Sequence, residues 1–161
     1  MIQITEYGDD AVALIEFLEA LQDYLVTIDP LERLRRLPQY GPAYFPTLLQ
    51  KISEKQGKIF IAKRENIPVG MIAGIIEDTS EEEELEMIPT KCGVILELFV
   101  DERYRGGKIG FSLMHAIEKY FQDEKCTLIS IEVFAPNKIA HNLYQKLGYQ
   151  DRNITVVKTL S

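Results

Sequence analysis

The feature that most restricts the fold of this chain is an apolar run that ends in a basic, glycine-rich turn. The run reads "VILELFV" over residues 94–100, and "RYRGGKIG" follows at residues 103–110. From about Gly107 to Gln122, apolar residues recur at the spacing of a helix with one buried stripe. A buried strand, a tight turn and a helix in this order predict an α/β (α+β) protein.

The turn has the chemistry of an anion site. The first amides of a helix lack intrahelical partners and lie at the positive end of the helix dipole. Glycine lets an anion approach the main chain without meeting a Cβ, and Arg105 and Lys108 can add charge-assisted hydrogen bonds. An ordinary tight turn would use the same glycines, so the stretch alone leaves both interpretations open. It lacks the patterns of triphosphate and dinucleotide loops.

The rest of the sequence predicts helices before a hairpin, and further β and α segments after the turn. An acidic connection at 78–91 contains four consecutive glutamates, which are typical of a solvated loop. In chain order we expect a strand at 2–6, helices at 10–26, 29–37 and 44–55, hairpin strands at 58–64 and 67–77, the strand–turn–helix unit, a strand at 127–134, a helix at 137–147 and a closing β segment at 149–160.

Length and composition limit the class of protein. A chain of 161 residues with 46% hydrophobic and 27% charged residues is typical of one globular domain, which we assign to 1–161. No apolar run approaches the roughly 20 residues that span a bilayer, and the first ten residues lack the build of a signal peptide, so we expect a cytoplasmic protein. The net charge of −7 argues against binding to nucleic acid or anionic membranes. Cys92 and Cys126 are expected to be free thiols, and no cluster has metal-ligand spacing.

A second motif lies 32 residues after Arg105 and reads "NKIAHNLYQKLGYQ" over 137–150. The two stretches together resemble the GNAT superfamily of N-acetyltransferases. Its turn reads Q/R-x-x-G-x-G/A, and its later helix commonly reads N-x-x-A-x-x-L-Y-x-K-x-G-F/Y. Arg105 and Gly110 fill the outer positions of the turn, but Lys108 stands where the inner glycine is usual. The close resemblance covers about 92–150, and the N-terminal half fits only in outline.

The resemblance implies a fold and a cosubstrate. The fold would be a mixed sheet of about six or seven strands, flanked by helices and splayed between the fourth and fifth strands. Acetyl-CoA would lie in this splay, with its pyrophosphate on the turn amides and its pantetheine arm along a bulged strand. A side chain at Gly110 would occupy the space of the pyrophosphate. The implied cofactor-binding residues are Leu98, Phe99, Val100, Arg105, Gly106, Gly107, Lys108, Ile109, Gly110, Asn137 and Tyr144.

Transfer of an acetyl group to an amine implies two catalytic residues. A lysine-like amine has a pKa of about 10.4, so making it neutral at pH 7 costs roughly 4.6 kcal/mol. Glu97, a charged residue inside the apolar run, is the candidate base, although it would also suit the solvent side of a half-exposed strand. Tyr144 resembles the family's usual acid for the departing thiolate, although its spacing would equally suit a core tyrosine.

The acceptor and the partners are open at this stage. The expected acceptor is a primary amine of a small molecule or peptide, and the acidic balance with Asp29, Glu77 and Asp78 favours a cationic one. A homodimer is a further expectation from the resemblance. The alternative function is a catalytically silent CoA-binding sensor or interaction module of the same fold. A nucleotide-binding α/β protein is disfavoured because the triphosphate loop is missing.

Overall fold

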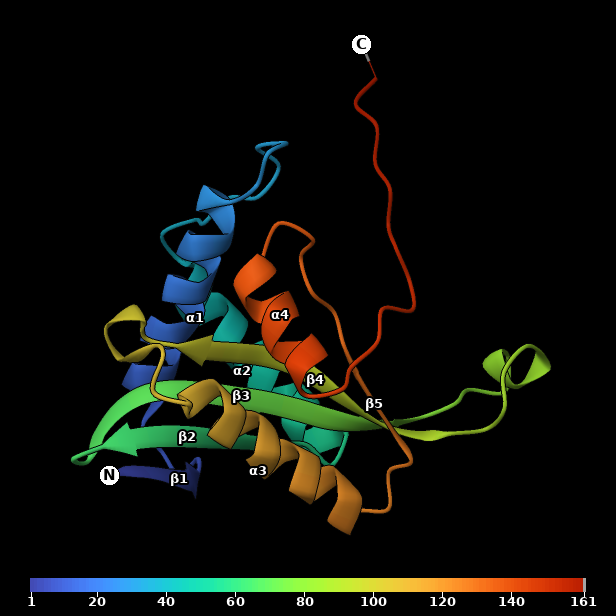
Figure 1. Ribbon diagram of the computed structural model, residues 1–161, viewed down its shortest axis with the longest axis horizontal. Coiled ribbons are helices and arrows are strands. Elements are labelled where there is room, and N and C mark those ends of the chain that lie inside the picture. The colour runs from blue at the N-terminus through green and yellow to red at the C-terminus, as the bar shows by residue number, and fades with distance from the viewer. Residues whose placement is uncertain (161) are drawn as a thin grey trace.

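A mixed sheet forms the centre of the computed structural model, which describes residues 1–160 (Figure 1). Within these residues the sheet has five strands in the order β1-β2-β3-β4-β5, all antiparallel except the parallel pair β4 and β5. The strands are β1 (Ile2–Glu6), β2 (Lys58–Arg64), β3 (Ile67–Asp78), β4 (Lys91–Val100) and β5 (Leu128–Ile131). The helices are α1 (Ala11–Thr27), α2 (Tyr40–Glu54), α3 (Ile109–Asp123) and α4 (Lys138–Lys146), with short 3-10 turns at Glu83–Leu85 and Glu102–Tyr104.

The two faces of the sheet carry separate cores. Helices α1 and α2 pack on one face through Phe17, Leu48 and their neighbours, and α3 packs on the other through residues that include Phe121. Glycines admit the Phe121 ring, because a Cβ at Gly93 would lie 2.4 Å from it and one at Gly74 would lie 2.7 Å from it. The predicted α/β (α+β) fold, a mixed sheet flanked by helices, is therefore confirmed.

The predicted hairpin is confirmed as β2 and β3. Its two turn residues, Glu65 and Asn66, both have positive φ angles, of 51° and 65°. Two successive left-handed residues are the turn that matches the twist of a hairpin. The acidic connection between β3 and β4 is exposed and projects from the body, as Figure 1 shows at the right.

The predicted helix at 29–37 is wrong. Asp29 does accept backbone amides as a helix cap would, from Leu31 at 3.0 Å, Arg33 at 2.6 Å and Leu34 at 2.8 Å. Glu32, however, has a φ of 52°, which a right-handed helix does not contain. The side chain therefore closes an irregular loop, and helix α2 begins later, at Tyr40.

The predicted closing β segment at 149–160 is also wrong for this chain. None of these residues is in a strand, and the segment runs away from the body toward the labelled C-terminus (Figure 1). Ile154 is 85% exposed and Val156 is 87% exposed. Strand propensity expresses itself only against a neighbouring strand, and this segment has none, so the described sheet has five strands instead of six or seven. Among residues 1–160, none of the helices combines the length and the apolar character that crossing a bilayer requires.

Candidate active site

Strands β4 and β5 separate in mid-sheet. They pair only between Cys92–Ile95 and Leu128–Ile131, while β4 continues to Val100. Along 96–100, the edge of β4 that would face β5 therefore has no β5 partner. The predicted splay is confirmed, and the main chain at 98–100 is freed by the end of β5, although we expected a bulge to free it.

The bulge of β4 lies two residues before the expected range 98–100, and it sets the direction of the Glu97 side chain. In the pairing with β3, Ala73 faces Glu97 but the next residue, Gly74, faces Ile95, so Leu96 is the extra residue. Side chains in a regular strand alternate between faces, and one inserted residue shifts this alternation. As a result, both Leu96 and Glu97 reach the face covered by α1 and α2.

Glu97 is held in a cluster of tyrosines. The Tyr44 hydroxyl donates a hydrogen bond of 2.6 Å to Glu97 Oε1. The rings of Tyr40 and Tyr44 stack, with centroids 5.6 Å apart and planes at 23°. Burial raises the pKa of Glu97, while the Tyr44 hydrogen bond and the charge of Lys51 lower it. Glu97 is thus a largely enclosed carboxylate and does not lie on a solvent-facing strand side.

Tyr144 comes from α4 on the other face of the sheet and lies close enough for the charge of Glu97 to act on it. Its ring belongs to the core and is 6% exposed. Burial, and then the negative charge of Glu97, raise the pKa of Tyr144 to about 12. The Tyr144 hydroxyl has no hydrogen-bond partner within residues 1–160. In this part of the chain, every side-chain nitrogen or oxygen that is enclosed has a partner, so the Tyr144 hydroxyl is not enclosed. The hydroxyl therefore opens to solvent, and a core ring carries an available proton donor.

The glycine turn presents open main chain. Gly106 has a φ of 83°, and a Cβ there would meet nothing within 4 Å. A Cβ at Gly107 would meet only the Tyr104 carbonyl oxygen, at 3.5 Å. Lys108, the residue that replaces the family's inner glycine, has a φ of 64° and precedes the first turn of α3. The position thus needs a left-handed residue, which explains the family's preference for glycine there.

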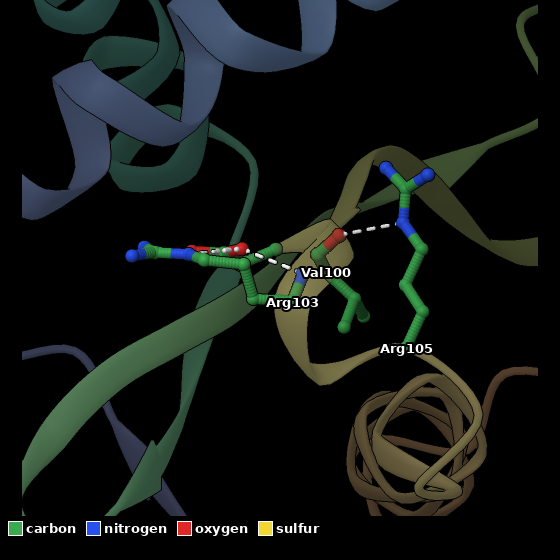
Figure 2. A network of polar contacts seen from close by, with 4 residues as sticks. Val100, Arg103 and Arg105 are labelled. Carbon is green, nitrogen blue, oxygen red and sulfur yellow. Dashed lines mark hydrogen bonds and ion pairs between the residues drawn. The ribbon is translucent and has the colours of Figure 1, made fainter.

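The arginines before the turn extend in opposite directions (Figure 2). Arg105 Nε donates to the Val100 carbonyl oxygen at 3.0 Å, and its guanidinium lies 5.4 Å from the ring centroid of Tyr24. Arg103 pairs with the Asp101 carboxylate, at 3.0 Å and 2.5 Å for two of its contacts. The charge of Arg103 is therefore balanced locally, and Arg105 ties the turn to the end of β4.

Three of the predicted cofactor-binding residues have structural roles. Gly110 lies close to α4, because a Cβ there would lie 3.1 Å from Leu143 Cδ2. Ile109 is buried in the α3 core, so only its main chain faces the turn. Asn137 caps α4, and its side-chain oxygen accepts the Ala140 amide at 3.3 Å. Our expectation that a side chain at Gly110 would point into the pyrophosphate space does not match this geometry.

The carboxylates that suggested a cationic acceptor are engaged elsewhere. Asp29 caps its own loop, and Glu77 pairs with Lys55. Glu77 and Asp78 also lie opposite Cys92 and Lys91, at the far end of β4 from the splay. A groove of about 760 Å³ runs instead between α1, Phe99 and the segment 101–105.

Sequence reasoning missed Tyr40 and Tyr44. The signal was present, because two tyrosines at i and i+4 share one face of a helix. Gly41, Pro42 and Pro46 blurred the start of that helix in the sequence, so its predicted range began at 44. No pattern in the sequence links α2 to the bulged position of β4.

The comparisons with known proteins agree with this geometry. The Acetyltransferase (GNAT) family model matches residues 15–149. An N-alpha-acetyltransferase from Sulfurisphaera tokodaii is 30% identical over 132 residues, which cover 79% of this chain and 77% of that protein. A mutant BH1408 protein from Bacillus halodurans has the same fold, with a TM-score of 0.86, 22% identity and 99% of both chains covered. AAC(6')-Iy, solved with a CoA-containing bisubstrate analogue, has a TM-score of 0.66 at 15% identity over 100% of this chain and 99% of that one.

The chain therefore belongs to the GNAT family of acetyltransferases. The members of this family use acetyl-CoA as cosubstrate, and this chain is an acetyl-CoA-dependent N-acetyltransferase.

Proposed function

We propose that this enzyme transfers the acetyl group directly to a primary amine, with Glu97 as the base and Tyr144 as the acid. The observation that carries the proposal is the proximity of these two groups, which the electrostatic effect of Glu97 on Tyr144 indicates. The charge of Glu97 is felt by Tyr144, although the two residues come from different elements. A base and an acid close together are what an amine and a departing thiol require.

Each residue has a definite proton to move. Glu97 accepts the proton of the incoming ammonium, directly or through water, and its raised pKa makes it a stronger base than an exposed glutamate. The amine nitrogen then forms a bond to the acetyl carbon as the carbon–sulfur bond breaks. Tyr144 donates its hydroxyl proton to the departing sulfur, so the thiol leaves neutral, and the excess proton of the new amide nitrogen passes to the Tyr144 phenolate, directly or through water, and restores the hydroxyl.

The two proton transfers assist one another. A pKa of about 12 keeps Tyr144 protonated at neutral pH, but it also makes proton donation to a thiolate unfavourable. The negative charge of Glu97 is one cause of that high value. Once Glu97 has taken the amine proton this charge is gone, so the pKa of Tyr144 falls at the step where Tyr144 must act as an acid.

We place acetyl-CoA against the turn and the free edge of β4. The turn supports this placement because its glycines leave the main chain open and α3 begins there. The pyrophosphate would lie on the amides of Arg105 to Gly110, and the pantetheine arm would follow the backbone of Leu98, Phe99 and Val100. Asn137, as the cap of α4, and Tyr144 would border the arm.

The acceptor we propose is a cationic primary amine of a small molecule or peptide. The groove beside Phe99 supports this class, since its lining carries five carboxylates against the guanidinium groups of Arg103 and Arg105. The carboxylates are those of Asp10, Glu16, Asp23, Asp101 and Glu102. Asp23 pairs with Arg36 and Asp101 with Arg103, so Asp10, Glu16 and Glu102 are the ones that have no cationic partner within residues 1–160. The name of the Sulfurisphaera relative makes a peptide α-amino group a reasonable first member of the panel. We further propose a single-domain cytoplasmic enzyme that forms a homodimer.

Release of free thiol from acetyl-CoA across a panel of amines tests the proposal. The panel contains free α-amino peptides, lysine peptides, polyamines, aminoglycosides and uncharged amines. We expect turnover with a cationic amine, and loss of turnover in Glu97→Gln and Tyr144→Phe without loss of acetyl-CoA binding in calorimetry. Full turnover in both variants would contradict the assigned roles, and a best substrate that is neutral would contradict the charge argument.

A further inference from the structure

The carboxylate of Glu97 has one bound oxygen and one free oxygen. Oε1 accepts the Tyr44 hydroxyl at 2.6 Å. Oε2 has no partner within residues 1–160. Every enclosed side-chain oxygen in these residues has a hydrogen bond, so Oε2 is not enclosed and must reach solvent. The tyrosine therefore fixes which oxygen faces α2 and leaves the other available for a proton.

We propose that Tyr44 is a positioning residue for the reaction, acting through its hydrogen bond to Glu97 to orient the carboxylate and keep it ionised. This inference rests on the proposed role of Glu97 as base. Tyr44 is not assigned a contact with substrate or with acetyl-CoA.

The local backbone makes such an anchor necessary. Glu97 follows the extra residue of the bulge, where the ladder between β3 and β4 is interrupted. A glutamate has three side-chain torsions, and burial alone does not select one orientation of its carboxylate. A hydrogen bond from a separate helix, 53 residues away in sequence, selects one.

Tyr40 restricts Tyr44 in turn. The two rings are one helical turn apart on α2 and stack at 5.6 Å, so the Tyr44 ring cannot swing away from β4 without losing this contact. The negative charge of Glu97 contributes to the raised pKa of both Tyr40 and Tyr44, after burial, so both phenols stay protonated at neutral pH. Tyr44 is then always able to donate.

The expected effect of losing the Tyr44 hydroxyl on the pKa of Glu97 follows from whether each neighbouring group raises or lowers that pKa. Burial raises the pKa of Glu97, and the Tyr44 hydrogen bond and then Lys51 lower it. The groups that face this carboxylate are Tyr40, Tyr44 and Lys51 from α2 and Tyr144 from α4. A donor stabilises the ionised form, so removing the Tyr44 hydroxyl must raise the pKa of Glu97.

The test titrates Glu97 in the free protein and in turnover. Carboxyl-labelled glutamate gives a carbon NMR signal for Glu97, which is assigned by its loss in Glu97→Gln. Tyr44→Phe keeps the ring but removes the donor, and we expect the Glu97 midpoint to rise by about one pH unit. Tyr40→Phe is the matched control, because it removes a hydroxyl from the same helix face that has no bond to Glu97, and its midpoint should stay at the wild-type value.

The activity profile separates the inference from the proposed function. In Tyr44→Phe the acid limb of kcat/KM should move up in pH with the NMR midpoint, so that activity one unit below the wild-type limb falls about tenfold. An unchanged Glu97 midpoint in Tyr44→Phe would overturn the role of Tyr44. A midpoint that rises while the acid limb stays in place would instead overturn Glu97 as the base.

Discussion

At the scale of single residues, local geometry decides what each side chain can do. The 2.6 Å hydrogen bond from Tyr44 orients the largely enclosed carboxylate of Glu97. Tyr144 packs in the core, but its hydroxyl is open to solvent and can donate a proton. The identity and motif of Tyr144 were visible in the sequence, because its helical register is local. The partner of Glu97 was not, because it depends on contact between two elements distant in sequence.

Lys108 provides a prediction at this scale. A non-glycine residue with a φ of 64° carries a cost of about 1 kcal/mol that glycine avoids. Both Lys108→Gly and Lys108→Ala remove the ammonium group, but only the first removes the strain. We expect Lys108→Gly to be more stable than Lys108→Ala by about 1 kcal/mol in urea unfolding. Equal stability of the two variants would show that the left-handed conformation is not costly here.

At the scale of elements, the sequence pattern correctly predicted the elements that depend on residues near one another in sequence. It failed for the elements whose conformation depends on contacts between distant residues. The hairpin and the strand–turn–helix unit follow from periodicity and glycine placement, and both are confirmed. The helix at 29–37 had a good capping residue, but Glu32 adopts a left-handed conformation and Asp29 closes a loop instead. The position of the bulge was likewise missed, because a strand read alone does not reveal its register against β3.

The turn between β4 and α3 provides the element-scale prediction. Gly107 is exposed, and a Cβ there would meet only the Tyr104 carbonyl oxygen, at an ordinary contact distance of 3.5 Å. Gly107→Val should therefore weaken acetyl-CoA binding at least tenfold, about 1.4 kcal/mol, with little change in melting temperature, as measured by calorimetry and thermal unfolding.

Gly110→Val is the contrasting variant for this turn. Its side chain would press on Leu143 of α4, so it should lower the melting temperature. Unchanged acetyl-CoA affinity in Gly107→Val would rule out the placement of the pyrophosphate on these amides.

At the scale of the whole molecule, the C-terminal segment stands out because its apolar side chains are exposed, which packing within one chain does not explain. Tyr149 donates to Glu118 at 2.9 Å and Asp151 contacts His141 at 2.6 Å, so the chain is anchored up to this point. Beyond it, apolar side chains such as Val157, 69% exposed, contact no core. Exposed apolar side chains in such a segment favour contact with another molecule.

A shortened chain that ends at Asp151 tests whether the C-terminal segment takes part in the proposed homodimer. Because neither core includes any of residues 152–160, the melting temperature should stay close to that of the full chain. If the proposed homodimer uses the segment, light scattering after size exclusion should give a dimer for the full chain and a monomer for the shortened one. A full chain that is monomeric across the concentration range would contradict the proposed dimer.

The most direct measurement of the central claim is the turnover of Tyr144→Phe with two thioesters. The variant keeps the ring that packs in the core but removes the hydroxyl that opens to solvent. With acetyl-CoA, kcat should fall by roughly 10² to 10⁴, while melting temperature and acetyl-CoA affinity stay nearly unchanged. With an activated thioester, whose thiol is more acidic, the loss should shrink, because a better leaving group needs less help from an acid. A folded variant that turns over acetyl-CoA at the wild-type rate would contradict the assignment of Tyr144 as the acid.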